Sequence, residues 1–177
     1  MKISCIFEKY LYASVYPRDY KVVWTPEMCE YFDEEEVLIN EMRRLFELWT
    51  NPYYLMNYFK NNESFLESHY WRSKNFSIED LAKITKEKAL QFEDKLFKKV
   101  DLLDSCFQPL NDNHTKIQNI SESKYKKSWL RIYAIKVDAN RYLITGGAIK
   151  LTKKMRDHPE TEKELLKLEK EQDLFTK

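Results

Sequence analysis

The chain has 177 residues, of which 43% are hydrophobic and 15% aromatic, and its formal net charge is +1 at pH 7. This length predicts one domain, residues 1–177, with a core that needs no disulfide or metal, and the aromatic content argues against disorder. No apolar run approaches the ~20 residues that a membrane helix needs, and the first residues do not read as a signal peptide. We therefore expect a cytoplasmic protein with no membrane partner.

The cysteines, histidines and glycines limit the chemistry that we expect. The three cysteines are widely spaced and odd in number, which indicates reduced thiols, and the three histidines lack the spacing of metal ligands. The only two glycines are adjacent, so neither a dinucleotide-binding motif nor a phosphate-binding loop can be written with them. We expect no metal site and no cofactor.

Residues 1–24 are expected to contribute strands. The runs 2–7 and 11–16 are rich in β-branched and aromatic residues and are separated by a polar turn, and 21–24 is a candidate third strand. The acidic run 33–36 then predicts the first turn of a helix that extends to residue 49, because carboxylates are favourable at a helix N-terminus.

This first helix opens a helical section that we place at residues 33–103. A short aromatic helix is expected at 53–59. Ser77 to Asp80 then resembles a capping box, and it begins the longest expected helix, whose apolar residues fall mostly on one face as far as Leu103. The Trp and Tyr residues of this section are assigned to the core.

A β-hairpin follows, with strands at 129–137 and 141–145 and a turn between them. Side chains alternate along a strand, so Trp129, Arg131 and Tyr133 are expected to share one face. An arginine within an apolar strand requires either a carboxylate partner inside the protein or a phosphate outside it. With a last helix from Pro159 to Leu174, the sequence predicts an α+β fold. Its small antiparallel sheet combines the N-terminal strands with the hairpin.

The hairpin region is strongly basic. From His114 to Arg156 there are eleven Lys or Arg residues and two acids, a net charge of +9, while the rest of the chain is acidic. A local field of this sign attracts polyanions, which means nucleic acid or an acidic protein. The alternative is that these charges only solvate the hairpin.

Residues 105–177 also carry a resemblance. The run 107–110, the strand 129–133, the segment 146–150 and the following Lys153-Lys154 precede a Glu/Lys-rich helix. This arrangement resembles the RelE/ParE superfamily of toxins, and especially the HigB-like, phage-derived branch. The resemblance implies a toxin-antitoxin system in which the toxin cleaves mRNA at the ribosome and is restrained by a cognate antitoxin. The helical section would then be an enlargement of the family fold.

The resemblance implies roles for individual residues in metal-independent cleavage, in which the 2′-hydroxyl attacks the adjacent phosphate. Arg131 would clamp the phosphate, Lys150 would add positive potential or protonate the leaving oxygen, and Tyr133 would stack on a base or transfer a proton. His158 is the histidine candidate for a proton shuttle, but the pattern favours an exposed residue before a helix, so we assign it no catalytic role. The expected nucleic-acid contacts are Lys126, Lys127, Lys153, Lys154 and Arg156.

Two other functions fit the same residues. One is a noncatalytic module of mobile-element origin that binds nucleic acid or an acidic protein through the basic face. The other is a gyrase-directed inhibitor, because the ParE branch shares the fold but acts through protein contacts. The net acidity of the last helix also suggests that it shields the basic surface when no partner is bound.

Overall fold

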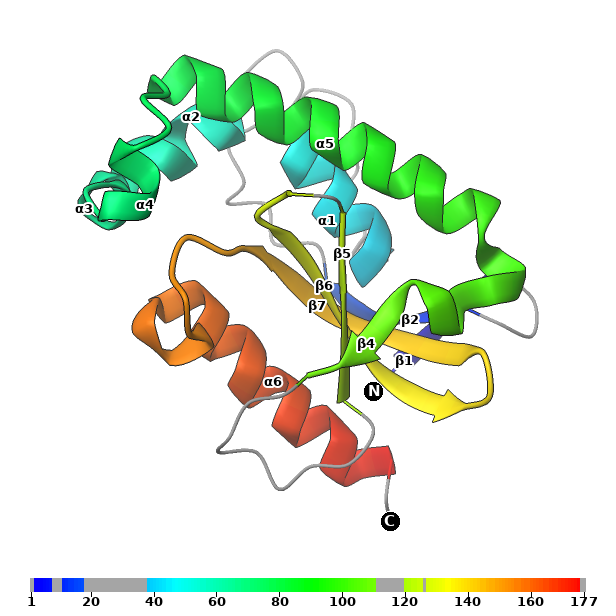
Figure 1. Cartoon of the computed structure of the whole chain (residues 1–177). Helices are drawn as coiled ribbons and strands as arrows, with labels where there is room; N and C mark the ends of the chain where they lie inside the picture. Colours follow the sequence, from blue (N-terminus) through cyan, green and yellow to red (C-terminus); the bar gives the residue numbers. More distant parts are fainter. Residues whose placement is uncertain (1, 8–10, 18–37, 111–119, 126, 176–177) are drawn as a thin grey trace.

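Helices cover both faces of one sheet, so the protein is α+β (Figure 1). The computed structural model describes residues 2–7, 11–17, 38–110, 120–125 and 127–175. The helices α1, α2 and α5 lie on one face of the sheet, and α6 lies on the other. None of the helices in these ranges is long and apolar enough to cross a membrane.

The sheet has seven strands in the order β1-β2-β7-β6-β5-β4, and β3 also pairs with β2. The strands are β1 (Lys2–Phe7), β2 (Leu11–Pro17), β3 (Leu38–Asn40), β4 (Phe107–Pro109), β5 (Ile120–Lys124), β6 (Leu130–Asp138) and β7 (Arg141–Ile149). The predicted strands at 2–7 and 11–16 are confirmed, as is the hairpin. Strand β7 is longer than predicted, because it continues through both glycines to Ile149.

The expectation of a purely antiparallel sheet is wrong at one junction. Leu11–Ala13 of β2 pairs in parallel with Tyr142–Ile144 of β7. Parallel neighbours need a long crossover connection, and the helical section between the two strands supplies it. The N-terminal strands are therefore joined to the hairpin by the β2–β7 pair, which lies inside the sheet.

The helices are α1 (Glu41–Thr50), α2 (Pro52–Asn61), α3 (Glu63–Leu66), α4 (His69–Arg72), α5 (Ile78–Lys98) and α6 (Pro159–Phe175), with short 3₁₀ turns η2 (Val100–Ser105) and η3 (Met155–Asp157). The capping box that predicts the start of α5 is confirmed. The Asp80 N–H donates to Ser77 Oγ over 3.1 Å, and the Ser77 N–H donates to Asp80 Oδ2 over 3.0 Å.

The first helix begins later than the acidic run predicts. It starts at Glu41, and Asn40 caps it by accepting a hydrogen bond from the Arg43 N–H over 2.9 Å. Residues 38–40 are a strand, because their backbone extends the sheet beside β2 and the Asn40 side chain then supplies the N-terminal cap. The acidic run 33–36 and the candidate strand 21–24 lie outside the described residues.

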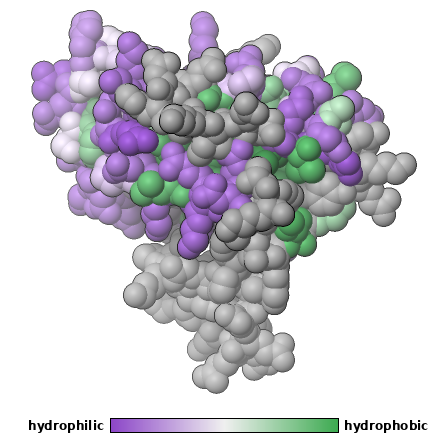
Figure 2. Space-filling view, turned by 90° about the horizontal axis from the view of Figure 1, so that it is seen from below, coloured by the Kyte–Doolittle hydropathy of each residue, from purple (hydrophilic) through white to green (hydrophobic). Residues whose placement is uncertain are grey.

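Two apolar cores lie on opposite faces of the sheet. The larger one packs α1, α2 and α5 against β6 residues such as Ile132 and Ala134. The smaller one lies under α6 and includes Tyr133, Leu165 and Leu168. Seen from below, the surface of the described residues is mostly hydrophilic, with small groups of hydrophobic residues (Figure 2).

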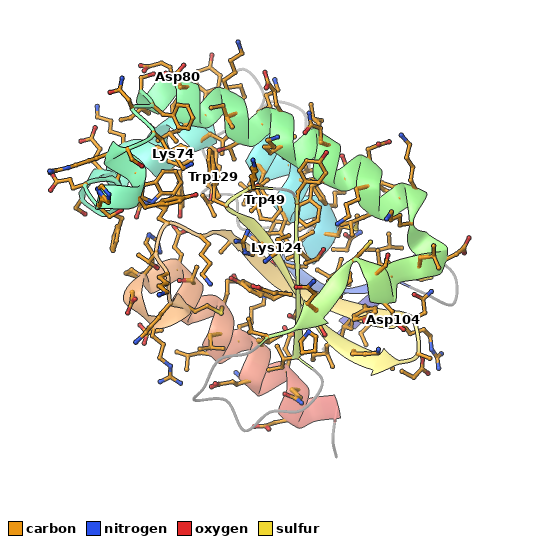
Figure 3. All side chains as sticks on the ribbon, in the orientation of Figure 1. Trp49, Lys74, Asp80, Asp104, Lys124 and Trp129 are labelled. Carbon is orange, nitrogen blue, oxygen red and sulfur yellow. The ribbon has the colours of Figure 1, made fainter. Side chains whose placement is uncertain are left out.

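Trp129 lies with the larger core, and the prediction that it shares a face with Arg131 and Tyr133 is wrong. Strand β6 begins at Leu130, so the alternation of faces does not reach Trp129. The indole N–H donates to Thr85 Oγ1 over 2.7 Å, and the ring lies 5.1 Å from the ring of Trp71. Trp129 therefore anchors the start of the hairpin to the helices, as Figure 3 shows.

Candidate functional site

A cleft of about 890 Å³ lies between the helices α3 and α4 and the root of the hairpin, which is the start of β6 and the segment after β7. Its charged and aromatic lining residues are Phe65, Glu67, Tyr70, Trp129, Arg131, Lys150, Lys153 and Asp157. Two of the three predicted catalytic residues, Arg131 and Lys150, thus meet in one cleft together with Lys153. The sequence predicts that these cations act together, but it gives no sign that α3 and α4 form the opposite wall.

Buried side chains hold the two walls in place. Trp71 Nε1 donates to the Leu151 carbonyl over 2.8 Å, and the Tyr58 hydroxyl donates to the Ile149 carbonyl over 2.9 Å. On the hairpin side, the Lys150 N–H donates to the Trp129 carbonyl over 2.7 Å. These bonds join three parts of the chain that are distant in sequence, so the cleft has a defined shape.

Arg131 is largely engaged inside the protein. Its Nη1 donates to the carbonyls of Ser128 and Leu130 over 2.7 and 2.8 Å, and its Nε lies 3.8 Å from Glu122 Oε2. The side chain is 17% exposed. Of the two partners that the sequence left open, the structure contains the carboxylate, and the exposed part of the guanidinium still borders the cleft.

Tyr133 does not reach the cleft. It is fully buried beneath α6, where burial and the nearby Glu122 carboxylate raise the pKa of its hydroxyl. It pairs across the sheet with Gly146, which has no side chain and so lets α6 approach this row of the sheet. While α6 is in place, the Tyr133 ring is not accessible to a base. It therefore cannot stack on a base in the way that the resemblance implies.

The other predicted contact residues flank the cleft. Lys153, Lys154 and Arg156 are exposed in the segment after β7, and Lys127 is exposed in the turn before β6. Among the described residues no ion pair joins these four side chains to an acid. Lys126 lies outside the described residues.

His158 is buried, and the expectation of an exposed side chain is wrong. Its Nδ1 accepts from the Glu160 N–H over 3.3 Å, and its Nε2 lies 2.9 Å from Asn62 Oδ1. The ring of Phe65 covers it at 4.4 Å between ring centroids, and burial lowers the pKa of the imidazole. Asn62, between α2 and α3, and Phe65 of α3 thus contact the histidine that precedes α6.

The tip of the hairpin carries basic residues that sequence reasoning counted with the others. Asp104 of η2 accepts from Lys136 Nζ over 2.8 Å and from the Tyr142 hydroxyl over 2.6 Å, and Arg141 pairs with Asp138. These partners lower the pKa of the Asp104 and Asp138 carboxyls. The cations at the tip are therefore paired with acids, whereas the salt bridges of the described residues include none with Lys127, Lys153, Lys154 or Arg156.

The described residues hold no group of three or more His, Cys, Asp or Glu side chains that could bind a metal ion. No family model matches the chain, and neither the curated proteins nor the solved structures include one that matches it.

Proposed function

We propose that this protein binds single-stranded nucleic acid in the cleft at the root of the hairpin. The observation that supports this most is that Arg131, Lys150 and Lys153 border the same cleft as the aromatic side chain of Tyr70, which is 58% exposed. Proteins that bind single strands combine cations along the backbone with aromatic rings on which bases stack.

The surroundings of Tyr70 strengthen this proposal. Lys74 Nζ lies 4.6 Å from the centroid of the Tyr70 ring, so positive charge accompanies the stacking surface. The cleft has the size of a pocket for a small ligand. It therefore suits an unpaired nucleotide better than the regular surface of a duplex.

The test is fluorescence anisotropy with a short labelled single-stranded RNA, the DNA of the same sequence, and the corresponding duplexes. We expect the single strands to bind more tightly, with an affinity that falls as salt rises from about 50 to about 200 mM. In the double variant Lys150→Ala/Lys153→Ala, two phosphate contacts are lost. The slope of log K against log salt should then become shallower by about 1.4.

The matched control is Lys83→Ala/Lys86→Ala, which removes two exposed lysines from α5. It changes the net charge by the same amount and should leave the salt slope unchanged. Equal losses in the two double variants would show that the protein attracts nucleic acid only through its overall charge, and the cleft would then not be the binding site.

A second candidate is the metal-independent endoribonuclease of a toxin-antitoxin system, acting on mRNA at the ribosome and held inactive by a cognate antitoxin. The position of Arg131 favours it, because a guanidinium beside Lys150 in a cleft is suited to stabilise a pentacovalent phosphate. RNA should then be cleaved in the presence of a metal chelator, and Arg131→Lys should abolish cleavage because the planar fork is lost. Growth arrest without RNA cleavage would instead favour a protein target such as gyrase.

A further inference from the structure

The side of α6 that faces the sheet is unusually polar. Among the side chains of α6 that the structure describes, Leu165 and Leu168 are buried, and so are the polar Thr161, Glu171 and Gln172. A helix that packs on a sheet usually buries an apolar stripe. The docking of α6 therefore depends on polar contacts as well as on Leu165 and Leu168.

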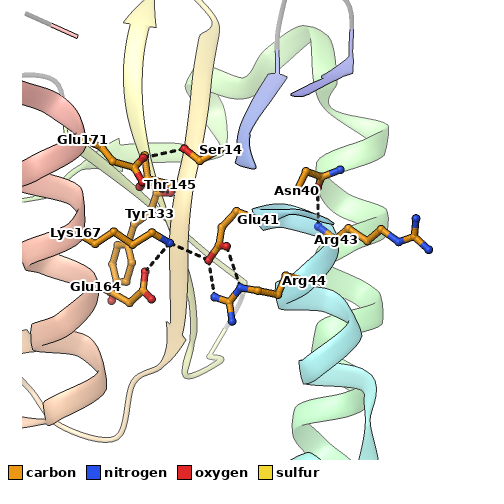
Figure 4. A network of polar contacts seen from close by, with 10 residues as sticks. All are labelled: Ser14, Asn40, Glu41, Arg43, Arg44, Tyr133, Thr145, Glu164, Lys167 and Glu171. Carbon is orange, nitrogen blue, oxygen red and sulfur yellow. Dashed lines mark hydrogen bonds and ion pairs between the residues drawn. The ribbon is translucent and has the colours of Figure 1, made fainter. Parts of the chain in front are cut away.

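Glu164 lies at the centre of these contacts. Its carboxylate lies over Gly146, where any side chain would collide with Oε2. This Oε2 is buried and has no hydrogen-bond partner in the described part of the chain, and Lys167 Nζ is 4.0 Å away. Figure 4 shows the pair of Glu164 and Lys167 with Tyr133 beside it.

Lys167 cannot neutralise Glu164 fully, because it also pairs with the buried Glu41 of α1 over 3.2 Å. Glu41 in turn accepts from Arg44 Nε and Nη2 over 2.9 and 2.5 Å. The remaining groups whose charges act on Glu164 are Arg44 of α1 and Lys163 of α6, while the nearby Tyr54 and Tyr133 are neutral in this pH range because their pKa values are raised. The outcome is that burial raises the pKa of the Glu164 carboxyl to about 7.

Glu171 is a second buried acid on the same face. It is 6% exposed and accepts a hydrogen bond from Ser14 Oγ of β2 over 2.8 Å. The hydrogen bond from Ser14 only partly opposes the effect of burial. Burial raises the pKa of this carboxyl to about 7 as well.

The part of the sheet under α6 is also polar and incompletely satisfied. Glu122 Oε2, Arg131 Nε and Tyr133 Oη are buried and have no hydrogen-bond partner among the described residues, and the first two form an ion pair only at 3.8 Å. Glu122, Tyr133 and Gly146 form one cross-strand row, and Glu164 lies above its last member. Buried polar groups without partners raise the free energy of the docked state relative to one in which water reaches them.

We propose that α6 is a releasable cover over Glu122, Arg131 and Tyr133, and that ionisation of Glu164 and Glu171 loosens it. Docking keeps both carboxyls protonated at a pH at which exposed carboxyls are ionised. Raising the pH therefore charges two groups that burial favours in their neutral form. When α6 moves away, both carboxylates reach solvent, and so do the polar groups of the sheet.

The direction of the pH dependence follows from the raised pKa values of these carboxyls. Docked α6 holds more protons than released α6 between about pH 4.5 and about pH 7, so docking is strongest at the acidic end and weakens as pH rises. Glu160, at the start of α6, also has a raised pKa and acts in the same direction. The lowered pKa of His158 acts in the opposite direction, because its protonation at acidic pH disfavours the docked state.

Hydrogen exchange, followed by mass spectrometry and corrected for the intrinsic effect of pH, tests the proposal on the full chain. The protection of α6 peptides relative to α5 peptides should fall at least about ten-fold between about pH 5.5 and about pH 8. The variant Glu164→Gln/Glu171→Gln should remove most of this change, while the contribution of His158 stays the same.

The matched control is Glu162→Gln/Asp173→Asn, which neutralises two exposed acids of the same helix and should keep the wild-type pH profile. A further variant, Gly146→Ala, displaces the Glu164 carboxylate and should increase the exchange of α6 at every pH. Protection of wild-type α6 that does not change with pH would overturn the proposal, even if the glutamine variant failed to fold. The same holds for a pH response that survives both glutamine substitutions in a folded variant.

Discussion

The tip and the root of the β6–β7 hairpin differ in how the protein uses positive charge. At the tip, Lys136 and Arg141 each have an acidic partner, Asp104 and Asp138. At the root, Lys153 has no acidic partner among the described residues, and it borders a cleft together with Arg131 and Lys150. Figure 3 shows that Asp104 and Trp129 mark opposite ends of the hairpin.

This difference teaches that the net charge of a segment is a poor guide to where it binds. At the tip, η2 contributes an acid that pairs with Lys136, whereas the wall opposite the root contributes Phe65 and Tyr70 together with Glu67. Surface pairs contribute little free energy to stability, so the acids at the tip mainly cancel the local field.

The largest effect is expected from Gly147→Ala at the root. A Cβ at Gly147 would lie 2.6 Å from the Arg131 carbonyl oxygen and 2.8 Å from Leu45 Cδ1, so backbone and core must both shift. We expect the free energy of unfolding to fall by about 2 to 3 kcal/mol, because overpacking a close-packed core forces such shifts. Urea denaturation followed by circular dichroism measures it.

The control at the tip is Ala139→Ser, which adds one heavy atom to an exposed turn residue. It should change the free energy of unfolding by less than about 0.5 kcal/mol. Similar losses in the two variants would mean that the root is no more tightly packed than the tip. The argument that the glycines allow close packing would then fail.

The second-largest effect is expected on the affinity for RNA, when one arginine at the root and one at the tip of the hairpin are replaced. Arg131→Gln should weaken the binding of single-stranded RNA about ten-fold, which corresponds to the loss of one charge-assisted contact. Arg141→Gln should leave the affinity within about two-fold, because Asp138 already neutralises this guanidinium. Anisotropy at one fixed salt concentration measures both, after circular dichroism confirms that each variant is folded.

Equal weakening in Arg131→Gln and Arg141→Gln would break the contrast, because it would mean that the whole hairpin acts as one diffuse field. An unchanged affinity in Arg131→Gln would have a different meaning. Its guanidinium would then serve only the internal contacts with Glu122, Ser128 and Leu130.

The elements of the fold were largely predictable, since they depend on local patterns. Alternation indicates β6 and β7, and the capping box at Ser77 gives the start of α5. The acidic run at 33–36 predicts too early a start for α1, because it is a weaker signal than the Asn40 cap that follows it. The parallel β2–β7 pair depends on how distant segments meet, and local patterns do not contain that information.

The candidate site was only partly predictable for the same reason. Alternation correctly places Arg131 and Tyr133 on one face, but it does not reveal that α6 covers Tyr133. The contacts that decide the other outcomes join residues far apart in sequence. Asp104 meets Asn140 across 36 positions, and His158 meets Asn62 across 96. A buried histidine and an internally paired basic residue have no local signature that separates them from exposed ones.

The smallest effect is expected from a substitution at the tip of the hairpin. Asp104→Asn removes the charge that Lys136 pairs with, while the amide can still accept from the Tyr142 hydroxyl. The pair is exposed, so the free energy of unfolding should fall by only about 0.5 kcal/mol near neutral pH. Because its partners lower the pKa of Asp104, this contribution should persist down to mildly acidic pH and disappear as the carboxyl is protonated.

The same substitution leaves Lys136 without its acid, so single-stranded RNA should bind slightly more tightly and with a steeper salt dependence. If removing this acid instead leaves the salt dependence unchanged, the tip lies too far from the bound strand for its charges to matter, and the cleft alone accounts for binding.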